Sequence, residues 1–259
     1  MKTIITTAGR PDEETFLLAQ EASRTLGYPV IDRKKRSVRN MQLTYSANVL
    51  VAGKKRYEYF VFGVVEPFFF HPNSAAFRLK RILKGETDPL MAICGLKQGD
   101  SFLDCTLGLA SDSIVASFIT GSEGLVEGVE ADPAVAFITK KGLQAYEAKL
   151  PQLTEAMGRI RVIQEDAIQH LKRQPDRSWD IVYIDTMFSE PIEESTNFSA
   201  LRMAGMHSQL TEEWMAEAFR VCRKRVVVKD HFDSDVFGKF HLNRLIRPNT
   251  KFHFGYIDK

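Results

Sequence analysis

Apolar runs alternate with segments of helical spacing along most of this 259-residue chain, and the alternation is regular from residue 101 onward. Each apolar run leads into a helical segment, which is typical of βαβ units and predicts a largely parallel sheet covered by helices. We expect strands at 102–106, 125–130, 160–164, 180–185, 225–229 and 251–257, and helices at 112–120, 134–150, 167–173, 211–223 and 235–245. The pattern therefore predicts an α/β fold with an open, doubly wound sheet.

The first third of the chain has a less regular pattern. It predicts strands at 3–7 and 29–32, helices at 12–26 and 37–43, and a hairpin of 48–52 with 57–65 across the turn 53–56. An aromatic run that ends at Pro72 leads into a helix at 74–84, which Asn73 or Ser74 is suited to cap, and a second short helix reaches Cys94. We expect a smaller mixed α/β unit over residues 1–95 and a sheet domain over residues 96–259.

The composition is that of an ordinary globular protein, with 44% hydrophobic and 26% charged residues. The longest apolar stretch, 59–70, is interrupted by Gly63, Glu66 and Pro67 and falls short of the roughly 20 residues that span a bilayer. Polar residues stand where a signal peptide has its apolar run, and the three cysteines form no CxxC pair. These features predict a cytoplasmic protein without a membrane segment, a disulfide framework or a metal site.

The net charge of +2 conceals a locally basic first third. Three clusters of lysine and arginine occur there: Arg33, Lys34, Lys35, Arg36 and Arg39; Lys54, Lys55 and Arg56; and Arg78, Lys80, Arg81 and Lys84. Such clusters form either a solvated surface or a face that binds phosphate groups. Both interpretations stay open at this point.

Candidate chemistry is sought at the strand ends, because an open doubly wound sheet binds its ligand beyond the carboxyl ends of its strands. The first regular strand runs into the segment 104–112, in which Gly108 allows the backbone to approach a ligand closely. The dinucleotide signature GxGxxG is absent, which argues against NAD. A glycine in a strand-to-helix turn also has a purely geometric use, so this loop by itself is a weak signal.

The next two strands each end in acidic residues. Glu130 lies 26 residues after Asp104, where a carboxylate typically holds a ribose diol, whereas Asp132 before Pro133 is suited to cap a helix. Asp166 ends the third strand and is suited either to accept the exocyclic amine of an adenine or to cap the following helix. We expect Glu130 and Asp132 to have different roles.

The fourth strand delivers Asp185 and then the aromatic Phe188 to the same edge, which is the expected reaction site. Asp185, with the backbone carbonyl after it, is suited to accept hydrogen bonds from an amine and to orient its lone pair. Phe188 either stacks on a planar base or packs into the core. Lys229, at the end of the fifth strand, either faces the substrate or closes the strand with a solvated charge.

The series of strand ends resembles class I S-adenosylmethionine methyltransferases. More narrowly, it resembles the bacterial family of small-subunit ribosomal RNA guanine-N2 methyltransferases and its relatives in Gram-positive bacteria. The resemblance covers about residues 102–257 and is carried by Asp104, Thr106, Gly108 and Asp112, by Glu130, by Glu165, Asp166 and Ala167, by Ile184, Asp185, Met187 and Phe188, and by residues 225–229.

This resemblance implies a Rossmann-like, doubly wound, mostly parallel sheet and S-adenosyl-L-methionine as the cofactor. It implies cofactor contacts from Asp104, Thr106, Gly108, Asp112, Glu130, Ala131, Asp166 and Ala167, catalytic roles for Asp185 and Phe188, and no metal. The fourth motif reads Asp-Pro-Met-Phe-Pro in the family, whereas Thr186 and Ser189 replace the prolines here. The fold and the cofactor therefore carry over further than the guanine acceptor does.

The expected function is methylation of an exocyclic amine of a base in RNA, with ribosomal RNA as the partner. The basic clusters would follow the phosphate backbone, and Phe69 and Phe70 would stack or pack. The alternatives are a methyltransferase of a small molecule or a protein, and a non-catalytic RNA-binding protein that retains the cofactor fold. His71 stays outside the catalytic set, because a lone histidine is more often structural, and the oligomeric state is left open.

Overall fold

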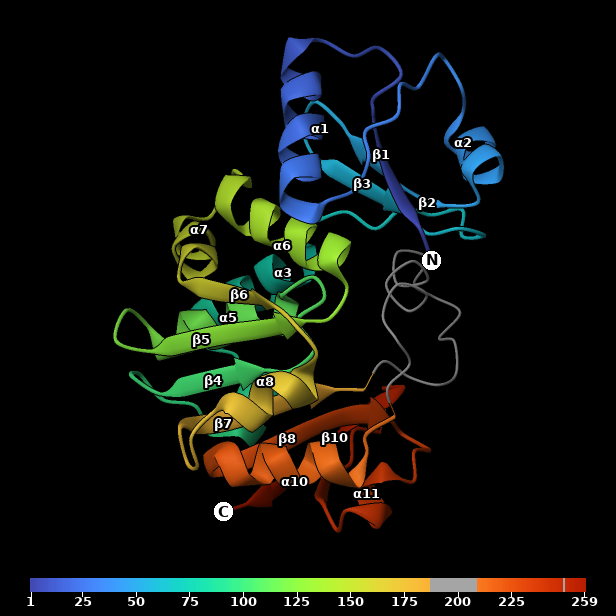
Figure 1. Ribbon diagram of the computed structural model, residues 1–259. Coiled ribbons are helices and arrows are strands. Elements are labelled where there is room, and N and C mark those ends of the chain that lie inside the picture. The colour runs from blue at the N-terminus through green and yellow to red at the C-terminus, as the bar shows by residue number, and fades with distance from the viewer. Residues whose placement is uncertain (187–208, 249) are drawn as a thin grey trace.

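The computed structural model describes residues 1–186, 209–248 and 250–259, and its larger sheet has seven strands (Figure 1). The strand order is β6 (Ile160–Gln164), β5 (Leu125–Glu130), β4 (Ser101–Asp104), β7 (Trp179–Asp185), β8 (Cys222–His231), β10 (Phe252–Asp258) and β9 (Asn243–Leu245). The strands from β6 to β8 are parallel, and β10 is antiparallel to both of its neighbours. The predicted α/β class and the mostly parallel, doubly wound sheet are confirmed.

Helices cover both faces of this sheet, because its central strands are apolar on both sides. Phe102 and Tyr183 face a core shared with α5 (Ser111–Thr120), α6 (Pro133–Ala145) and α7 (Pro151–Gly158). Leu103 and Ile184 face the opposite core, shared with α8 (Ala167–Arg173), α10 (Glu212–Val221) and α11 (Val236–Lys239). Alternate residues of each central strand therefore pack against the helices on opposite faces of the sheet. The helices cover the faces of the sheet and not the carboxyl ends of its strands.

A separate three-stranded sheet forms the beginning of the chain. It has β1 (Thr3–Thr7) parallel to β2 (Asn48–Ala52), and β2 paired in a hairpin with β3 (Tyr57–Phe60), as predicted. Helix α1 (Glu13–Leu26) covers one face and α2 (Val38–Tyr45) the other. The side with α1 packs against α6, where the Tyr57 and Phe137 rings meet edge to face at 4.9 Å.

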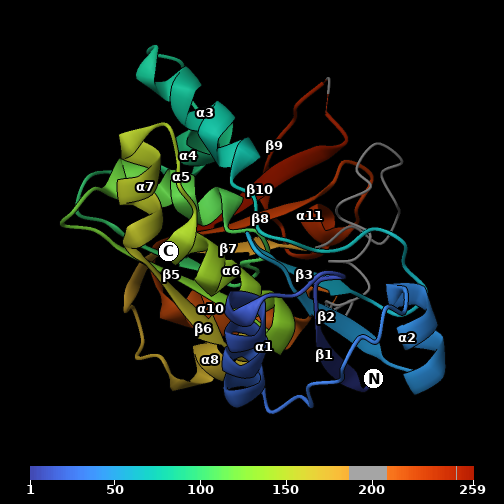
Figure 2. The same ribbon diagram turned by 90° about the horizontal axis from the view of Figure 1, so that it is seen from above.

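Two further helices lie between the sheets in sequence. These are α3 (Asn73–Leu83) and α4 (Pro89–Cys94), and both pack against α5 of the larger sheet (Figure 2). Asp88 caps α4 by accepting hydrogen bonds from the N–H groups of Leu90 and Met91. The domain boundary near residue 95 stays a prediction.

The predicted helix 134–150 is wrong in its last five residues, 146–150. Helix α6 ends at Ala145, and α7 begins at Pro151. Proline lacks a backbone N–H and disfavours helical geometry in the residue before it, so Leu150 is extended and Pro151 starts a new helix.

Two other helical predictions give way to strands near the carboxyl end. The predicted helix 235–245 is reduced to the single turn of α11, because His241 adopts a left-handed φ of 50° and residues 243–245 pair with β10 as β9. The predicted helix 211–223 ends at Val221, and Cys222 and the residue after it begin β8. In both places pairing with a neighbouring strand overrides local helical propensity.

Three smaller predictions for the first third are also wrong. The strand 29–32 is a single bridge between Val30 and Ile5, because Pro29 has no N–H to donate and the chain turns through left-handed residues at 34–35. The strand 57–65 ends at Phe60, before the chain turns through Gly63 with a φ of 84°. Neither Asn73 nor Ser74 caps α3, whose N-cap position is taken by Pro72.

Candidate active site

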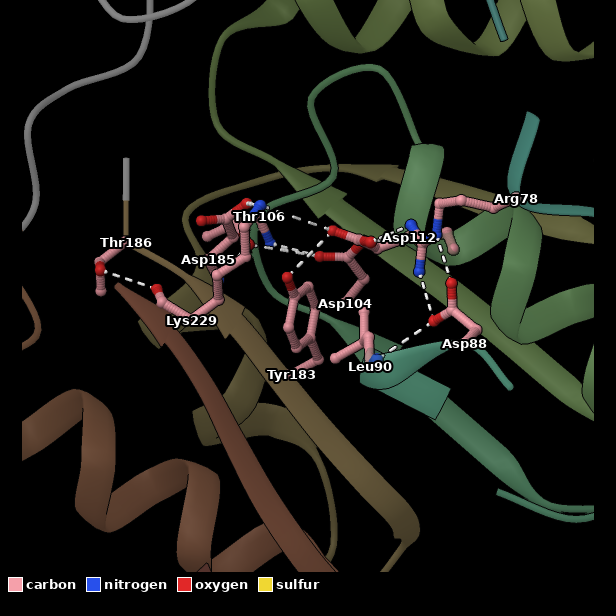
Figure 3. A network of polar contacts seen from close by, with 11 residues as sticks. Arg78, Asp88, Leu90, Asp104, Thr106, Asp112, Tyr183, Asp185, Thr186 and Lys229 are labelled. Atoms are coloured by element: carbon pink, nitrogen blue, oxygen red, sulfur yellow. Dashed lines mark hydrogen bonds and ion pairs between the residues drawn. The ribbon is translucent and has the colours of Figure 1, made fainter. Parts of the chain in front are cut away.

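The candidate site lies where the strand order of the large sheet reverses, between β4 and β7. A cavity of about 310 Å³ opens there, and its lining includes the loop after β4, the ends of β7 and β8, and parts of α3 and β10. Five residues predicted from the sequence line it together: Asp104, Thr106, Gly108, Asp112 and Asp185. Figure 3 shows most of these side chains linked in one polar network.

Thr106 joins the loop after β4 to the end of β7. Its hydroxyl donates to the Asp104 Oδ1 atom at 3.3 Å and accepts from the backbone N–H of Asp185 at 2.8 Å. The other carboxylate oxygen of Asp104 accepts from the Ser113 hydroxyl at 2.6 Å. Burial, reinforced by the negative charge of Asp112, raises the pKa of Asp104 to about 7. Two strand ends are therefore held in fixed register around a buried carboxyl group.

The Gly108 turn is held from both sides. Gly108 has a left-handed φ of 49°, its N–H donates to Glu130 Oε2 at 3.1 Å, and its carbonyl accepts from the Thr139 hydroxyl at 2.6 Å. The second Glu130 oxygen accepts from the N–H of Asp132 at 3.0 Å. Burial raises the pKa of Glu130 to about 7, against the opposing effect of these backbone donors. Glu130 thus fixes the loop while each of its oxygens keeps a further lone pair for a ligand.

Asp112 is held by charges that the sequence places far apart. Arg78, from α3, donates to Asp112 at 2.5 Å and makes two hydrogen bonds to Asp88 at 2.7 and 2.9 Å, while the Tyr183 hydroxyl donates to Asp112 at 2.9 Å (Figure 3). Burial by itself would raise the pKa of Asp112, but the positive charges of Arg78 and Lys229 outweigh it and lower that pKa. Asp112, which is predicted to bind the cofactor, is therefore part of an ion-pair network with Arg78 and Lys229.

Removal of Arg78 is expected to destabilise the protein strongly. Arg78→Ala leaves Asp88 and Asp112 facing each other without their cation, and breaking a buried ion pair costs about 3–5 kcal/mol. Arg81→Ala is the matched control, because its pair with Glu86 is about half exposed and is worth less than about 1 kcal/mol. Urea unfolding measures both free energies, and equal losses in the two variants would contradict a buried network.

Asp185 forms an ion pair with Lys229 across the ends of β7 and β8. The Lys229 Nζ atom lies 2.5 Å from Asp185 Oδ2 and 4.0 Å from Asp112 Oδ2. Burial would lower the pKa of Lys229, but the two carboxylates outweigh it and keep that pKa above its ordinary value. Lys229 lines the cavity, so of its two possible positions it occupies the one that faces the site.

Thr186 replaces a proline of the family motif and makes two hydrogen bonds that proline cannot make together. Its N–H and its hydroxyl both donate to the backbone carbonyl of Lys229, at 3.1 and 3.0 Å. The segment after Asp185 therefore begins tied to β8. Phe188, the second predicted catalytic residue, and Ser189 lie outside the described residues.

The remaining predicted cofactor residues lie on the neighbouring strand ends and do not line this cavity. Ala131 and Asp166 are exposed, whereas Ala167 is buried. The Asp166 carboxylate caps α8 by accepting from the N–H of Gln169 at 3.0 Å. The ends of β5 and β6 are joined by the N–H of Glu165, which donates to the Glu130 carbonyl at 3.0 Å. Their cofactor contacts stay predictions.

The raised pKa of Asp104 makes stability depend on pH. In the fold this group titrates near 7 rather than at its ordinary 3.8, so the folded state binds more protons between these values. Its contribution to stability is therefore present below about pH 4 and is lost as the pH rises through about 7. Asp104→Asn cannot titrate, so the stability of this variant relative to wild type is expected to be more favourable at pH 8 than at pH 5.

Urea unfolding of both proteins at the two pH values measures this difference. The fixed penalty of placing an amide NH₂ group against the Thr106 and Ser113 donors is the same at both pH values, and it cancels in the comparison. A relative stability that is the same at pH 5 and pH 8 would contradict the raised pKa.

Half of the residues in the three basic clusters make side-chain contacts with other described residues: Arg33, Arg36, Lys54, Arg56, Arg78 and Arg81. Arg33 donates to the carbonyls of Thr7 and Arg36, and Lys54 pairs with Asp12 at 2.6 Å. Arg56 pairs with Glu58, and its guanidinium lies 3.6 Å from the centre of the Phe69 ring. Phe70 is buried and packs against the Tyr146 ring. These contacts stabilise the fold, and they involve residues for which the sequence left open a phosphate-binding function.

The Nδ1 atom of His71 is buried and has no hydrogen-bond partner among the described residues, and burial lowers the pKa of the imidazole. Within residues 1–186, 209–248 and 250–259, no group of three or more His, Cys, Asp or Glu side chains is placed to hold a metal ion. No helix among the same residues is long and apolar enough to cross a membrane.

Several residues that line the cavity were not assigned to it from the sequence, among them Arg78, Arg247 and Phe252. Arg78 was grouped with the basic surface, although it lies three residues after the buried Ala75, on the flank of the buried face of α3. Arg247 and Phe252 come from the end of the chain, where the predicted elements were partly wrong. The helical spacing was a usable signal for Arg78, whereas Arg247 had none.

Comparison with known proteins agrees with this geometry. The sequence model of the family described as "Putative SAM-dependent methyltransferase" matches residues 35–239, which is more than half of the chain. The chain belongs to this family: it is an S-adenosylmethionine-dependent methyltransferase, and its cofactor is S-adenosyl-L-methionine.

Three individual proteins are similar to this chain. The chain is 42% identical over 254 residues to "Uncharacterized protein YpiP" of Bacillus subtilis (strain 168), with 98% of each chain covered. It is 32% identical over 116 residues to ribosomal RNA small subunit methyltransferase J of Acinetobacter baylyi, covering 44% of this chain and 41% of that one. The crystal structure of the SAM-dependent methyltransferase NGO1261 from Neisseria gonorrhoeae shares the fold, with a TM-score of 0.59, 18% identity and coverage of 98% and 95%.

Proposed function

We propose that this methyltransferase transfers a methyl group to an exocyclic amine of a base in RNA, and that ribosomal RNA is the substrate. The observation that carries the proposal is the placement of Asp185 in the cavity beside the loop after β4, at the strand reversal of the sheet. Support for the substrate class comes from the relative named as a ribosomal RNA methyltransferase, whose match is partial. We also propose that the protein acts in the cytoplasm, because ribosomal RNA is its proposed substrate.

The residues at the ends of β4 and β5 fit the predicted cofactor. Glu130 is a carboxylate held by two backbone donors, suited to accept hydrogen bonds from ribose hydroxyls. The Gly108 turn brings backbone close to the cavity, where it is suited to hold the methionine portion, beside Asp104, Thr106 and Asp112. Ala131, Asp166 and Ala167 would surround the adenine. When bound, the cofactor supplies a methyl group activated by a sulfonium.

Asp185 has the role of orienting the acceptor. Its Oδ2 atom accepts a hydrogen bond from Lys229, and Asp185 lines the cavity, so Oδ1 would be the atom that accepts a hydrogen bond from an amine N–H. Hydrogen bonds from the amine to a carboxylate align the nitrogen lone pair, and transfer to such a nitrogen needs positioning more than acid–base strength. Phe188, by the same proposal, stacks on the base that carries the amine.

Transfer of label from methyl-tritiated S-adenosylmethionine tests the proposal. Purified protein is mixed with the cofactor and, in parallel, with small-subunit ribosomal RNA, with intact small subunits and with a protein-free, RNA-free small-molecule extract. We expect label in the RNA of the first or second mixture and none in the third. Label confined to the small-molecule extract would instead establish a small-molecule methyltransferase and overturn the RNA substrate.

A further inference from the structure

Two walls of the cavity come from elements outside the cofactor loop. Helix α3 contributes Ser74, Arg78 and Arg81, and the segment before β10 contributes Arg247. Figure 2 shows α3 and β9 on one side of the molecule, with the three-stranded sheet on the opposite side. The cavity is therefore bordered by α3 and by the segment before β10.

Arg247 is the lining cation that lacks a carboxylate partner among the described residues. The other three lining cations each have one, as described above. The Arg247 guanidinium lies over two aromatic rings instead, 4.8 Å from the centre of Phe252 and 5.5 Å from that of Phe254. Burial lowers the pKa of Arg247; the negative charge of Asp88 opposes this effect, and the positive charge of Arg78 adds to it. A partly buried arginine that forms no ion pair of its own among the described residues is suited to bind an anionic ligand.

Helix α3 also carries an exposed aromatic ring, Phe77, which does not itself line the cavity but lies beside the lining residue Arg81. The helix buries Ala75 and Leu79, while the Phe77 side chain is 63% exposed. Phe77 lies one turn before Arg81, and the Arg81 guanidinium is 5.8 Å from the centre of its ring. An exposed ring next to a cation is the arrangement on which proteins stack the bases of single-stranded nucleic acids.

We propose that a single-stranded segment of RNA crosses the cavity between Phe77 and Arg247, with a base stacked on Phe77 and a backbone phosphate bound by Arg247. This inference rests on the proposed function, because the segment brings its target base to Asp185. A base that reaches Asp185 leaves its stack. The two contacts hold the nucleotides that flank it on either side.

Arg247 lies in the segment between β9 and β10, and this position favours a contact with the substrate over one with the cofactor. The predicted cofactor residues lie at the ends of β4, β5 and β6, on one side of the strand reversal. Arg247 precedes β10, which is separated from β4 by β7 and β8. A cofactor bound over β4 and β5 leaves the β8–β10 side of the cavity for the acceptor.

The basic turn between β2 and β3 offers a rival surface. An open hollow there is lined by Arg33, Lys54, Lys55 and Arg56. Three of these side chains are held by contacts within the chain, and the hollow lies on the three-stranded sheet. It is therefore the weaker candidate for the RNA that enters the active site.

Steady-state methylation of small-subunit ribosomal RNA tests the assignment, with free RNA or intact small subunits as substrate, whichever the wild type labels, and with RNA and cofactor affinities measured in parallel. We expect Arg247→Ala and Phe77→Ala each to raise the KM for RNA about tenfold. Both should leave the Kd for S-adenosylmethionine within about twofold of wild type. Arg247→Ala should also lower the slope of log affinity against log salt by about 0.7, the value for one phosphate on a single strand, and Arg247→Lys should restore it. Lys54→Ala/Lys55→Ala is the matched surface control and should change the KM by less than about twofold.

The wild-type arm reports the proposed function by itself, since a wild type that methylates no RNA ends both proposals. If the wild type methylates RNA but Arg247→Ala and Phe77→Ala keep its KM and salt slope, the RNA path is wrong and the proposed function stands. A larger loss in the Lys54→Ala/Lys55→Ala variant would move the path to the three-stranded sheet. Weaker cofactor binding in Arg247→Ala would assign Arg247 to the cofactor carboxylate and would also overturn the inference.

Discussion

Asp185→Asn is expected to lower the rate of methyl transfer by at least about 100-fold while the Kd for S-adenosylmethionine stays within about twofold of wild type. The carboxylate is proposed to align the acceptor amine, and misalignment of a reacting atom by about 1 Å costs about 100-fold in rate. Cofactor affinity is retained because the proposed ribose and methionine contacts come from the ends of β4 and β5 and not from β7. Single-turnover transfer to RNA, with isothermal titration of the cofactor, measures both quantities.

The partner of Asp185 supplies the control for this prediction. Asp185→Asn leaves Lys229 buried without its closest carboxylate, and that charge by itself could distort the site. The double variant Asp185→Asn/Lys229→Gln removes the unpaired charge without restoring the carboxylate, so it should remain slow. Recovery of the rate in the double variant would show that the loss came from Lys229, and that Asp185 does not position the amine.

Glu130→Ala is expected to weaken the binding of S-adenosylmethionine by about 100-fold. Two charge-assisted hydrogen bonds to ribose hydroxyls contribute about 1.5 kcal/mol each, and about 3 kcal/mol corresponds to slightly more than 100-fold in Kd. The same substitution also releases the N–H of Gly108, which Glu130 holds at 3.1 Å. The expected loss of cofactor affinity therefore has two causes: the missing hydrogen bonds to ribose and the weaker positioning of the Gly108 turn.

Asp132→Ala is the matched control for Glu130→Ala. Asp132 follows two residues later and caps α6, accepting from the N–H groups of Ala134 and Val135 at 2.8 and 3.0 Å. Its loss should cost about 1 kcal/mol of stability and leave the cofactor Kd within about threefold. Isothermal titration with S-adenosylmethionine, and with NAD as the negative ligand, measures the binding. Equal losses in the two variants would contradict a ribose contact from Glu130.

The main features of this fold and site were predictable from local pattern. The regular alternation of apolar runs with helical segments after residue 101 predicts the parallel sheet, whose central strands are apolar on both faces. Because carboxyl ends of parallel strands meet at one edge, the acids that end β4 and β7 were expected to meet, and Asp104 and Asp185 do line one cavity. The separate roles of Glu130 and Asp132 also followed from Pro133, which marks the start of a helix.

The parts that failed depend on contacts between distant residues. The helical spacing places Arg78 on the flank of the buried face of α3, but it does not indicate that the guanidinium reaches Asp112, 34 residues later. Residues 243–245 have no strong strand pattern and become β9 only because β10 is there to pair with them. The ion pair of Asp185 with Lys229 likewise requires β7 and β8 to be neighbours, which the order of the elements implies but local spacing does not.

Identification of the methylated nucleoside tests the central claim most directly. Small-subunit RNA labelled by the wild-type protein with methyl-tritiated S-adenosylmethionine is digested to nucleosides and analysed by chromatography and mass spectrometry, with Asp185→Asn as the negative control. The account predicts one labelled nucleoside whose methyl group is on an exocyclic nitrogen, absent from the Asp185→Asn reaction. A methyl group on a ring atom or on ribose, or label that Asp185→Asn incorporates as fast as wild type, would contradict it.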